Sequence, residues 1–464
     1  MQDHFKIITF YDSIYTDRLQ CGRFSNLQRK RLNVPISFNG RFLYTIEKLI
    51  YPFILLAILL ATVISALYYL VNAYYSCIYV PPEFNNGYRA DNVTILIPVY
   101  NEDFNRFSNV LKSVSKQGSP FIVVGDGVNG RYKWITEALG GTFVTYPERK
   151  GKRYAMRVGG SQVKTEFVMF VDSDVIIPEN TVRSLIKNFG ERVGGVGPMI
   201  KIVDNGTKIS KGSEFVERAR EVVLRAMSHK GKSMMLDGQC SMYRTSLVKD
   251  FICSDEFTGL KLMGKPIMLG DDRQLTSHVL RKGYLTVRDP RVRVEVQPRE
   301  HWSDYYKQNL RWSRAGWFAF FRDVKNGTAS KAGKFYTFEL TMTYILPILL
   351  IFTALMRYFP IIIQSATFSL FVLVRPDMLY LHTIIFMHHL GLFFRSDRAF
   401  LGRMVLSFIS LFSTAVFGIA ISSTMDYKKK ISYYFSGMLA LFLVFVAYIT
   451  GLLTIWKQSK WLTR

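Results

Sequence analysis

The chain has 464 residues, and 60 lysines and arginines against 35 acidic residues give it a formal net charge of +25. This length is sufficient for one soluble domain and a membrane-embedded part. The excess of positive charge favours anionic partners such as lipid headgroups or phosphorylated substrates. Nucleic acid is not expected as a partner, because the sequence contains no zinc-finger, homeodomain or RNP-type motif. The four cysteines have neither metal-binding nor disulfide-framework spacing, which predicts free thiols in a reducing compartment.

The first 80 residues divide into a polar tail and an apolar run. Residues 1–48 are mixed in charge and contain no cleavable signal, because the apolar run that follows starts too late and is too long. Residues 49–80 contain no charged side chain and, at about 1.5 Å per residue, would form a helix of roughly 48 Å. That is longer than one bilayer core and too short for two spans, so we predict a single transmembrane helix.

Residues 88–300 have the pattern of an α/β domain. Short apolar runs at 93–99, 121–124 and 167–171 predict buried strands, and they alternate with amphipathic helical stretches. This alternation favours a mostly parallel sheet, whose ligands bind beyond the carboxyl ends of the strands. Asn101, Asp126 and the pair Asp172 and Asp174 follow those three runs, which predicts a site there.

Asp172-Ser173-Asp174 carries two carboxylates two positions apart. In an extended segment they would lie on the same side, where they could hold a divalent cation together with a diphosphate. Turn or cap carboxylates are the alternative interpretation. The position of the motif directly after an apolar run favours the metal site, with Asp174 and Asp172 as ligands.

Two further motifs lie downstream. Asp271 and Asp272 stand at a predicted helix start, either as capping residues or with one carboxylate that deprotonates an acceptor hydroxyl. Gln308, Arg311 and Trp312 lie at i, i+3 and i+4, hence on one helix face. The guanidinium suits phosphate and the indole suits a sugar ring, although an interfacial amphipathic helix at 301–334 would need the same residues.

The last part of the chain is apolar. Stretches at 335–356, 359–374, 378–394, 399–423 and 431–455 are long enough in several cases to cross a membrane, and we expect transmembrane or interfacial helices over 335–464.

Taken together, Asp126, Asp172-Ser173-Asp174, the 270–276 segment and the 308–312 segment resemble the signature of membrane-integrated, processive family 2 glycosyltransferases. The nearest likeness is to hyaluronan synthases and type 3 capsular polysaccharide synthases, over roughly 92–315. The resemblance implies an A-type glycosyltransferase domain that uses UDP-sugars with Mn²⁺ or Mg²⁺. It also implies that Asp174 holds the metal, that Asp272 is the base supported by Asp271, and that Trp312 contacts the acceptor.

The basic turn 150–153 and the segments 98–102 and 238–241 take their expected roles from the same resemblance. Gln239 and Cys240 are expected at the acceptor end with Trp312. The expected contacts of the nucleotide-sugar are Tyr100, Asn101, Glu102, Asp126, Lys152, Arg153, Asp172, Gln308 and Arg311.

One family element is missing. These synthases carry a Trp-Gly-Thr-Arg loop that closes over the nucleotide, whereas the corresponding residues 425–430 read Met-Asp-Tyr-Lys-Lys-Lys. The lysines are interpreted as membrane anchors, with diphosphate binding as the alternative. This departure leaves processivity and product open.

The orientation of the chain follows from its donor. Positive charges before residue 49 favour a cytosolic N-terminus, and a single span would then put the domain outside the cell. Because UDP-sugars are cytosolic, we expect the catalytic domain on the cytosolic face of the plasma membrane.

The sequence therefore predicts an inverting hexosyltransferase that extends a polysaccharide and translocates it across the membrane. The alternative is a non-processive enzyme that glycosylates a lipid, as a ceramide glucosyltransferase does. A transporter is disfavoured because we expect no buried acidic residue in the late helices, as an ion pathway would need. An inactive scaffold is disfavoured because every acidic residue of the family signature is present. The sequence makes no prediction of oligomeric state.

Overall fold

The computed structural model describes residues 40–267, 270–374, 397–425 and 430–458. The chain divides into two compact units, Met1–Phe53 and Ile54–Arg464, and all contacts below lie within the second. The polar tail up to residue 39, the predicted apolar segment 378–394 and residues 426–429 of the loop that replaces Trp-Gly-Thr-Arg lie outside the described residues.

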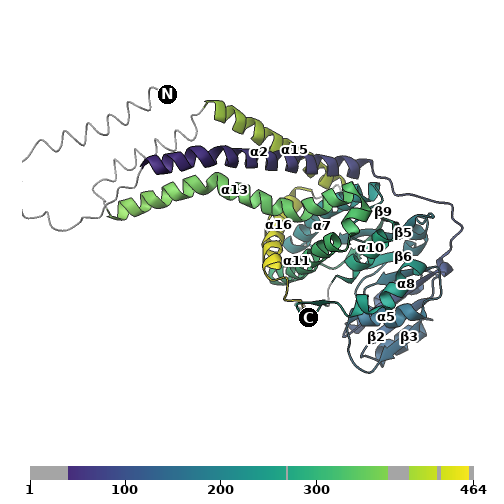
Figure 1. Ribbon diagram of the computed structural model, residues 1–464. Helices are drawn as coiled ribbons and strands as arrows, with labels where there is room; N and C mark the ends of the chain where they lie inside the picture. Colours follow the sequence, from purple (N-terminus) through teal and green to yellow (C-terminus); the bar gives the residue numbers. More distant parts are fainter. Residues whose placement is uncertain (1–39, 268–269, 375–396, 426–429, 459–464) are drawn as a thin grey trace, which may run out of the picture. The chain divides into compact units, whose positions relative to one another are not determined.

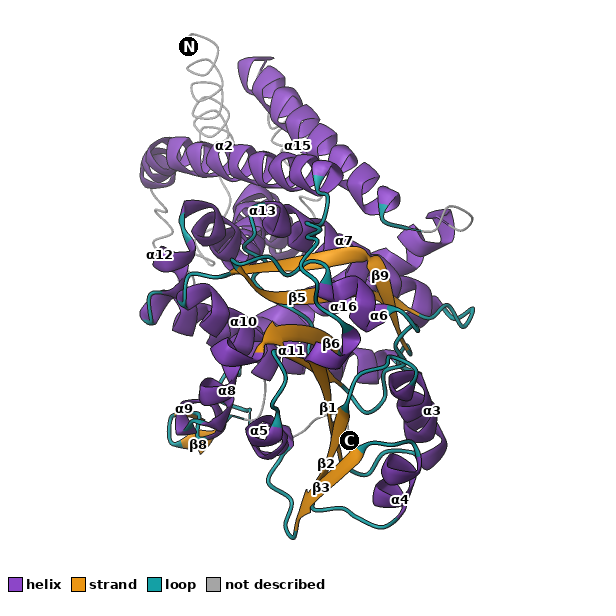
Figure 2. Cartoon of the chain, turned by 90° about the vertical axis from the view of Figure 1, so that its right-hand side faces the viewer, coloured by secondary structure: helices purple, strands orange, loops and turns teal. Residues whose placement is uncertain are grey.

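A seven-stranded sheet forms the centre of the α/β domain (Figure 2). Its order is β3-β2-β1-β4-β6-β5-β9, and every neighbouring pair is parallel except those of β6, which runs antiparallel to β4 and β5. The mostly parallel sheet expected from the sequence is confirmed. The strands are β1 Val93–Val99, β2 Phe121–Asp126, β3 Thr142–Tyr146, β4 Phe167–Val171, β5 Val193–Ile202, β6 Cys240–Arg244 and β9 Leu285–Val296.

Two apolar layers cover the sheet. Along β1, Ile95 and Ile97 face one cluster and Leu96 faces the other, because successive side chains of a strand point to opposite faces. The first cluster includes α3 Phe104–Ser115, α4 Arg131–Ala138 and α6 Thr181–Ile186. The second includes α5 Lys152–Gln162, α8 Thr245–Cys253, α9 Asp255–Thr258 and α10 Asp271–Arg281. The remaining short elements are the helix η1 Ala90–Asn92 and the hairpin of β7 Lys261–Leu262 and β8 Lys265–Pro266.

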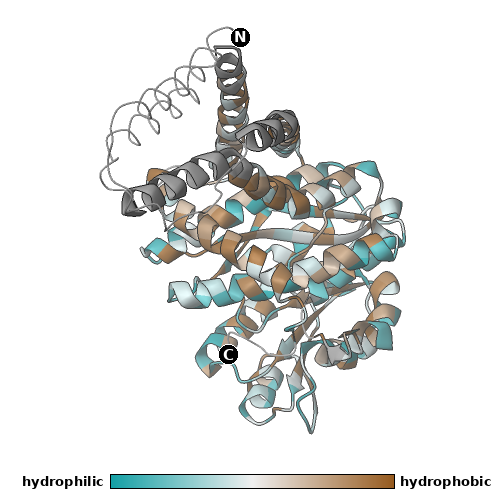
Figure 3. Ribbon diagram, turned by 60° about the vertical axis from the view of Figure 1, so that its left-hand side comes forward, coloured by the Kyte–Doolittle hydropathy of each residue, from teal (hydrophilic) through white to brown (hydrophobic). Residues whose placement is uncertain are grey.

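Four described helices are long and apolar enough to cross a membrane (Figure 1). They are α2 Gly40–Ile78, α13 Lys334–Val374, α15 Asp397–Ser423 and α16 Lys430–Leu453, and their candidate spans are Leu56–Ile78, Lys334–Thr353, Met404–Ser423 and Ile431–Leu453. In Figure 3 the helices of the α/β domain alternate hydrophilic and hydrophobic faces, as expected for half-buried helices. The predicted division between 335–356 and 359–374 is wrong, because one helix continues from Lys334 through Pro360 to Val374.

The helix α7, Lys208–His229, joins the domain to the membrane-type helices. Its residue Gly212 lies so close to α16 that an added Cβ would meet the Ser436 carbonyl at 2.8 Å, and a Cβ on Gly437 would overlap the ring of Phe215. On the same helix, Phe215 and Val222 share a buried cluster with Ala420 of α15. Glycine at both positions lets the two backbones approach closely, so that α7 and α16 form one packed seam.

Helix α11, Trp302–Lys325, and the short α12, Thr328–Ala332, complete the connection. Arg314 of α11 donates from Nε to Thr454 Oγ1 at 3.0 Å, which binds α11 to the end of α16. Arg273 of α10 forms a buried ion pair with Asp323 of α11, its NH2 lying 3.0 Å from Oδ2, and Tyr336 of α13 donates to the same oxygen at 3.1 Å. Three helices thus meet at one carboxylate.

One apolar helix pair contains a buried acid. Asn72 of α2 donates from Nδ2 to both carboxylate oxygens of Glu339 in α13, at 3.1 Å each, and neither residue is exposed. The expectation that the late helices bury no acidic residue is therefore wrong. Glu339 was overlooked because it is a single charge inside a long apolar run. The side-chain amide of Asn72 donates hydrogen bonds to its carboxylate across the helix interface.

Candidate active site

A cavity of about 2080 Å³ lies at the carboxyl ends of β1, β2 and β4. It continues between α2, α13 and α16, where Tyr68, Leu346 and Phe442 belong to its wall. Thirteen of the fifteen side chains predicted for the site line it: Tyr100, Asn101, Asp126, Lys152, Arg153, Asp172, Asp174, Gln239, Asp271, Asp272 and, from α11, Gln308, Arg311 and Trp312.

Lys152 lies between the two acidic motifs. It is the first residue of α5, after Gly151 with φ 91°, and its Nζ lies 2.7 Å from Asp172 Oδ1 and 3.1 Å from Asp271 Oδ2. Burial alone would lower the pKa of Lys152, but the carboxylates of Asp172 and Asp271 outweigh it and raise that pKa above its usual value. The lysine is therefore a fixed positive charge where a diphosphate would have to bind.

The three charged groups determine one another's ionisation. Burial raises the pKa of Asp172 despite Lys152. Burial also acts to raise the pKa of Asp271, but Lys152 and Arg153 overcome it and hold that pKa below the usual range. Asp271 is thus a permanent carboxylate, which fits an orienting role better than that of a base.

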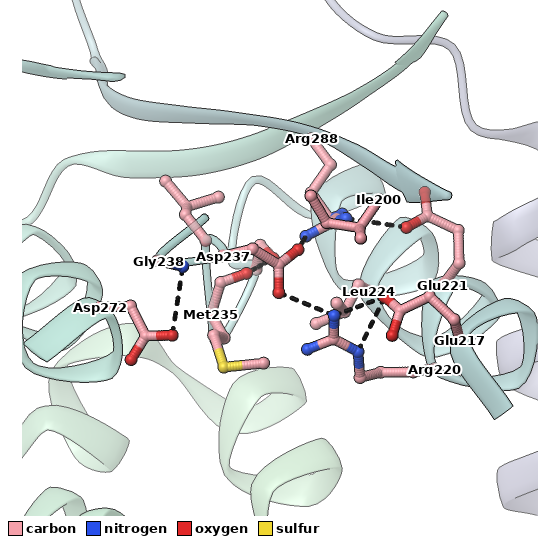
Figure 4. Close-up of polar contacts among 12 residues, drawn as sticks. Ile200, Glu217, Arg220, Glu221, Leu224, Met235, Asp237, Gly238, Asp272 and Arg288 are labelled. Carbon is pink, nitrogen blue, oxygen red and sulfur yellow. Dashed lines mark hydrogen bonds and ion pairs between the residues drawn. The ribbon is translucent and has the colours of Figure 1, made fainter. Parts of the chain in front are cut away.

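Asp272 has the opposite character. It lies in the first turn of α10, its Oδ1 accepts from Arg273 N at 2.7 Å, and its Oδ2 accepts from Gly238 N at 3.3 Å (Figure 4). Burial, and next the Asp271 carboxylate, raise the pKa of Asp272 from 3.8 to about 6. Two adjacent carboxyls with pKa values pushed apart are the pattern of a base beside a supporting charge.

The fall of kcat/KM at acidic pH should reflect protonation of the Asp272 carboxylate. A base must be ionised, so we expect kcat/KM of the free enzyme to rise with pH and to be half-maximal at pH about 6, the pKa of Asp272. The folded protein binds the Asp272 proton more tightly than the unfolded chain, so this group's contribution to stability falls as pH rises from about 4 to about 6. Initial rates between about pH 5 and 8 check the expectation, and a flat profile would contradict it.

Asp126 closes the opposite side of the site. Its Oδ1 accepts from Tyr146 Oη and from Lys150 N, both at 2.7 Å, and Gly151 N donates to it at 3.0 Å. The carboxylate thereby fixes the basic turn that precedes Lys152. The guanidinium of Arg149 lies 3.8 Å from the centre of the Tyr100 ring, a cation–π contact that the sequence reasoning missed although Arg149 belongs to the same basic run.

The predicted extended geometry of Asp172-Ser173-Asp174 is wrong. The segment is a turn after β4, with Val175 N donating to Asp172 O at 3.2 Å. Both aspartates nevertheless line the cavity. The described residues contain no group of three or more His, Cys, Asp or Glu side chains that could hold a metal by themselves. Two carboxylates fit a hard divalent cation whose other ligands are diphosphate and water oxygens.

Two predicted residues do not line the cavity. Glu102 is buried behind the turn and accepts from Ser173 Oγ at 3.3 Å, so it supports the Asp172-Ser173-Asp174 turn. Cys240 begins β6 with its side chain in the apolar core, whereas Gln239, in the turn just before the strand, lines the cavity. Arg153 lines the cavity, but its NH1 donates to the Phe257 carbonyl at 2.9 Å, which ties it to α9.

The α11 side behaves as the helical spacing predicted. Gln308, Arg311 and Trp312 lie on one helix and face the cavity, with Trp312 44 % exposed. The sequence reasoning missed a charged wall beside them, formed by Glu217, Arg220 and Asp237. These residues belong to no motif, and only the fold brings them to the cavity.

The sheet order is that of an A-type glycosyltransferase fold, with the cavity and the acidic cluster at the carboxyl ends of its strands. A mannosyltransferase from Pyrobaculum calidifontis, solved with GDP-Man and Mn²⁺, superposes with a TM-score of 0.52 at 17% identity, covering 71% of this chain and 95% of that one. At this identity the likeness establishes the fold alone.

Residues 90–315 match the family described as "Glycosyltransferase like family 2". The match covers just under half of the chain, and over these residues the chain is similar to family 2 glycosyltransferases. An N-acetylglucosaminyltransferase of Rhizobium meliloti is 29% identical over 238 residues, 48% of this chain and 55% of that protein. Hyaluronan synthase 2 of Bos taurus is 26% identical over 338 residues, 67% of this chain and 57% of that protein. The chain thus spans little more than half the length of these two relatives.

Proposed function

We propose that this protein is an inverting glycosyltransferase that transfers a sugar from a UDP-sugar to a growing polysaccharide and passes the product across the membrane. The observation that carries the proposal is the continuous cavity, which begins at Asp172, Asp271 and Asp272 and ends between α2, α13 and α16. A site that opens toward candidate membrane spans suits an acceptor that leaves along them.

The donor would bind at the carboxyl ends of β1, β2 and β4. Tyr100 and Arg149 offer a flat cation–π surface for a base, and Asp126 holds the turn that presents Lys152 to the diphosphate. A Mn²⁺ or Mg²⁺ ion held by Asp172 and Asp174 would neutralise diphosphate charge. Arg311, at the opposite wall, adds a guanidinium to the same anionic region.

Asp272 would remove the proton of the acceptor hydroxyl. The hydroxyl oxygen forms the new bond to the anomeric carbon while the bond from that carbon to the phosphate oxygen breaks, and the electron pair leaves with the nucleotide diphosphate. The proton goes to a carboxylate oxygen of Asp272, whose pKa of about 6 keeps it ionised but basic near neutral pH. In-line displacement inverts the anomeric centre. Trp312 would stack against the acceptor sugar.

A lipid acceptor is the second candidate, and a specific observation favours it. The membrane end of the cavity has an aliphatic part formed by Leu346, Leu350, Ile351, Leu355 and Leu441. A polysaccharide would gain little from such a wall, whereas an acyl chain would be buried in it. Tyr68, Tyr344 and Tyr448 line the same cavity and favour sugars, so product analysis must decide.

The deciding experiment is nucleotide release from detergent-solubilised protein with Mn²⁺ across a panel of UDP-sugars, with GDP-mannose included. Turnover with one or two UDP-sugars supports the proposal, and turnover with GDP-mannose alone would refute the UDP assignment. Product sizing separates a polymer from a glycolipid, since only the polymer grows with time. No release with any donor would overturn the enzymatic function.

The cytosolic orientation makes a separate prediction. The sequons at Asn92, Asn205 and Asn326 would be open to glycosylation if the domain faced the lumen, and Asn205 is exposed. We expect none to be modified when the protein is made in a eukaryotic cell. Gel mobility before and after glycosidase treatment checks this, with a sequon-bearing secreted protein as a control. A glycosidase-sensitive shift would place the domain on the other side of the membrane.

A further inference from the structure

A short turn connects Asp272 with the charged wall of Glu217, Arg220 and Asp237, which belong to no sequence motif. Residues 237–240 form this turn, with Cys240 N donating to Asp237 O at 3.2 Å. Gly238 N donates to Asp272 Oδ2 at 3.3 Å, and a Cβ on Gly238 would lie 3.3 Å from the Asp272 Cβ. The turn and Asp272 are therefore in direct contact, and displacement of one displaces the other.

Two arginines, Arg220 and Arg288, form ion pairs with Asp237 of this turn (Figure 4). Asp237 is 3 % exposed, and its Oδ1 lies 2.7 Å from Arg220 NH2 while its Oδ2 lies 2.5 Å from Arg288 NH1. Both carboxylate oxygens thus have a charged donor. The burial that would raise the pKa of Asp237 is outweighed by Arg220 and Arg288, so that its pKa is lowered and the residue remains a carboxylate.

The arginines are themselves anchored on separate elements. Arg288 is fully buried on β9 and its NH2 lies 3.0 Å from Glu221 Oε2 of α7. Arg220 also belongs to α7 and pairs there with Glu217. The turn is consequently tied through one carboxylate to a strand of the sheet and to the helix that packs against α16.

We propose that Asp237 is a positioning residue, which fixes the 237–240 turn so that the Gly238 N–H holds the Asp272 carboxylate toward the acceptor hydroxyl. The inference rests on the proposed role of Asp272 as the base. The turn also meets the nucleotide side, where Asp172 N donates to Gln239 O at 3.1 Å. That bond continues the β4–β6 ladder and involves backbone atoms only, so it depends less on the Asp237 side chain.

The test is Asp237→Asn in the full chain, with kcat and the KM values for donor and acceptor measured by nucleotide release. We expect kcat to fall between about 10-fold and 100-fold, because a small misplacement of a catalytic group has that effect, with both KM values within about 2-fold. Asp237→Glu should recover several-fold of the lost kcat because it restores the charge between the arginines.

Asp289→Asn is the matched control. Asp289 is also fully buried and held by an arginine, with Oδ1 2.8 Å from Arg291 Nε, and the hydrogen bonds described for its carboxylate all come from Arg291. This variant should lower the melting temperature without lowering kcat. Equal loss of kcat in Asp237→Asn and Asp289→Asn would reduce Asp237 to a structural role and overturn the inference. A raised acceptor KM with unchanged kcat would overturn it too, by making Asp237 a substrate contact.

Gly238→Ala covers the case in which Asp237→Asn does not fold. The added methyl group would press on Asp272 at 3.3 Å and leave the ion pairs intact, so kcat should fall at least about 10-fold while binding of UDP with Mn²⁺ persists. Unchanged kcat in Gly238→Ala would overturn this inference but not the proposed function. A wild-type protein without turnover would overturn the proposed function and this inference with it.

Discussion

Asp272→Asn should lower kcat by about 10²- to 10⁴-fold, the range that a general base contributes. The single amide oxygen can still accept an N–H from Gly238 or from Arg273, although not from both as the carboxylate does, and we expect the variant to bind UDP with Mn²⁺ as before. Nucleotide release and equilibrium binding, measured on the same preparation, check both halves of this expectation.

The variant should also be no less stable than the wild type. The fold raises the pKa of Asp272 to about 6, which means that ionising this carboxyl costs stability above that pH. A neutral amide removes the cost, so the melting temperature at about pH 8 should rise. Loss of turnover with a gain in stability excludes misfolding as the cause and is typical of catalytic residues.

Asp255→Asn supplies the control. Asp255 pairs with Arg157 at the protein surface, where its side chain is 91% exposed, and neither turnover nor melting temperature should change. Turnover by Asp272→Asn at more than about a tenth of the wild-type rate would contradict the assignment of the base.

Asp323→Asn should be the most destabilising single change in the region between α10 and α13. It leaves the guanidinium of Arg273, 6% exposed, without its carboxylate, and removal of one partner from a buried pair costs about 3–5 kcal/mol. Tyr336, which donates to the same oxygen at 3.1 Å, would keep only a neutral amide acceptor. Thermal unfolding in detergent measures the effect.

Glu179→Gln tests whether burial of the ion pair is the reason for the loss of stability expected in Asp323→Asn. Glu179 lies 2.8 Å from Lys116 on the surface, and we expect no measurable change in melting temperature when this pair is broken. An equally small effect of Asp323→Asn would show that Arg273 finds another acceptor. Since Arg273 directly follows Asp272, a fall in kcat should accompany the loss of stability.

Much of the fold could be predicted from apolar runs. The strand expected at 93–99 is β1 Val93–Val99, and that at 167–171 is β4 Phe167–Val171. Both are continuous apolar segments bounded by residues that end strands, and buried parallel strands give that signal clearly. The single helix of 41 residues at Lys334–Val374 was divided in the prediction at Arg357 and Tyr358, where a charged side chain interrupts the apolar run.

Site residues could be predicted where they are adjacent in the sequence and form a recognisable motif. Asp271 and Asp272 stand together at the start of α10, as predicted. Their different proton affinities come from burial, which raises the pKa of Asp272, and from Lys152 and Arg153, which lower that of Asp271 and are distant in the sequence. Glu102 and Cys240 were assigned to the cavity from their neighbours' resemblance. Cys240 is the first residue of β6 and lies in the core, and no strand was predicted at that position.

The seam between α7 and α16 bears on how the protein can be divided. A boundary at residue 334 looks natural in the sequence, yet Gly212 and Gly437 show that α7 was shaped by a helix more than 200 positions later. The α/β domain is therefore not a detachable module. Its transplantation onto another membrane anchor would need a glycine in the new partner opposite Phe215.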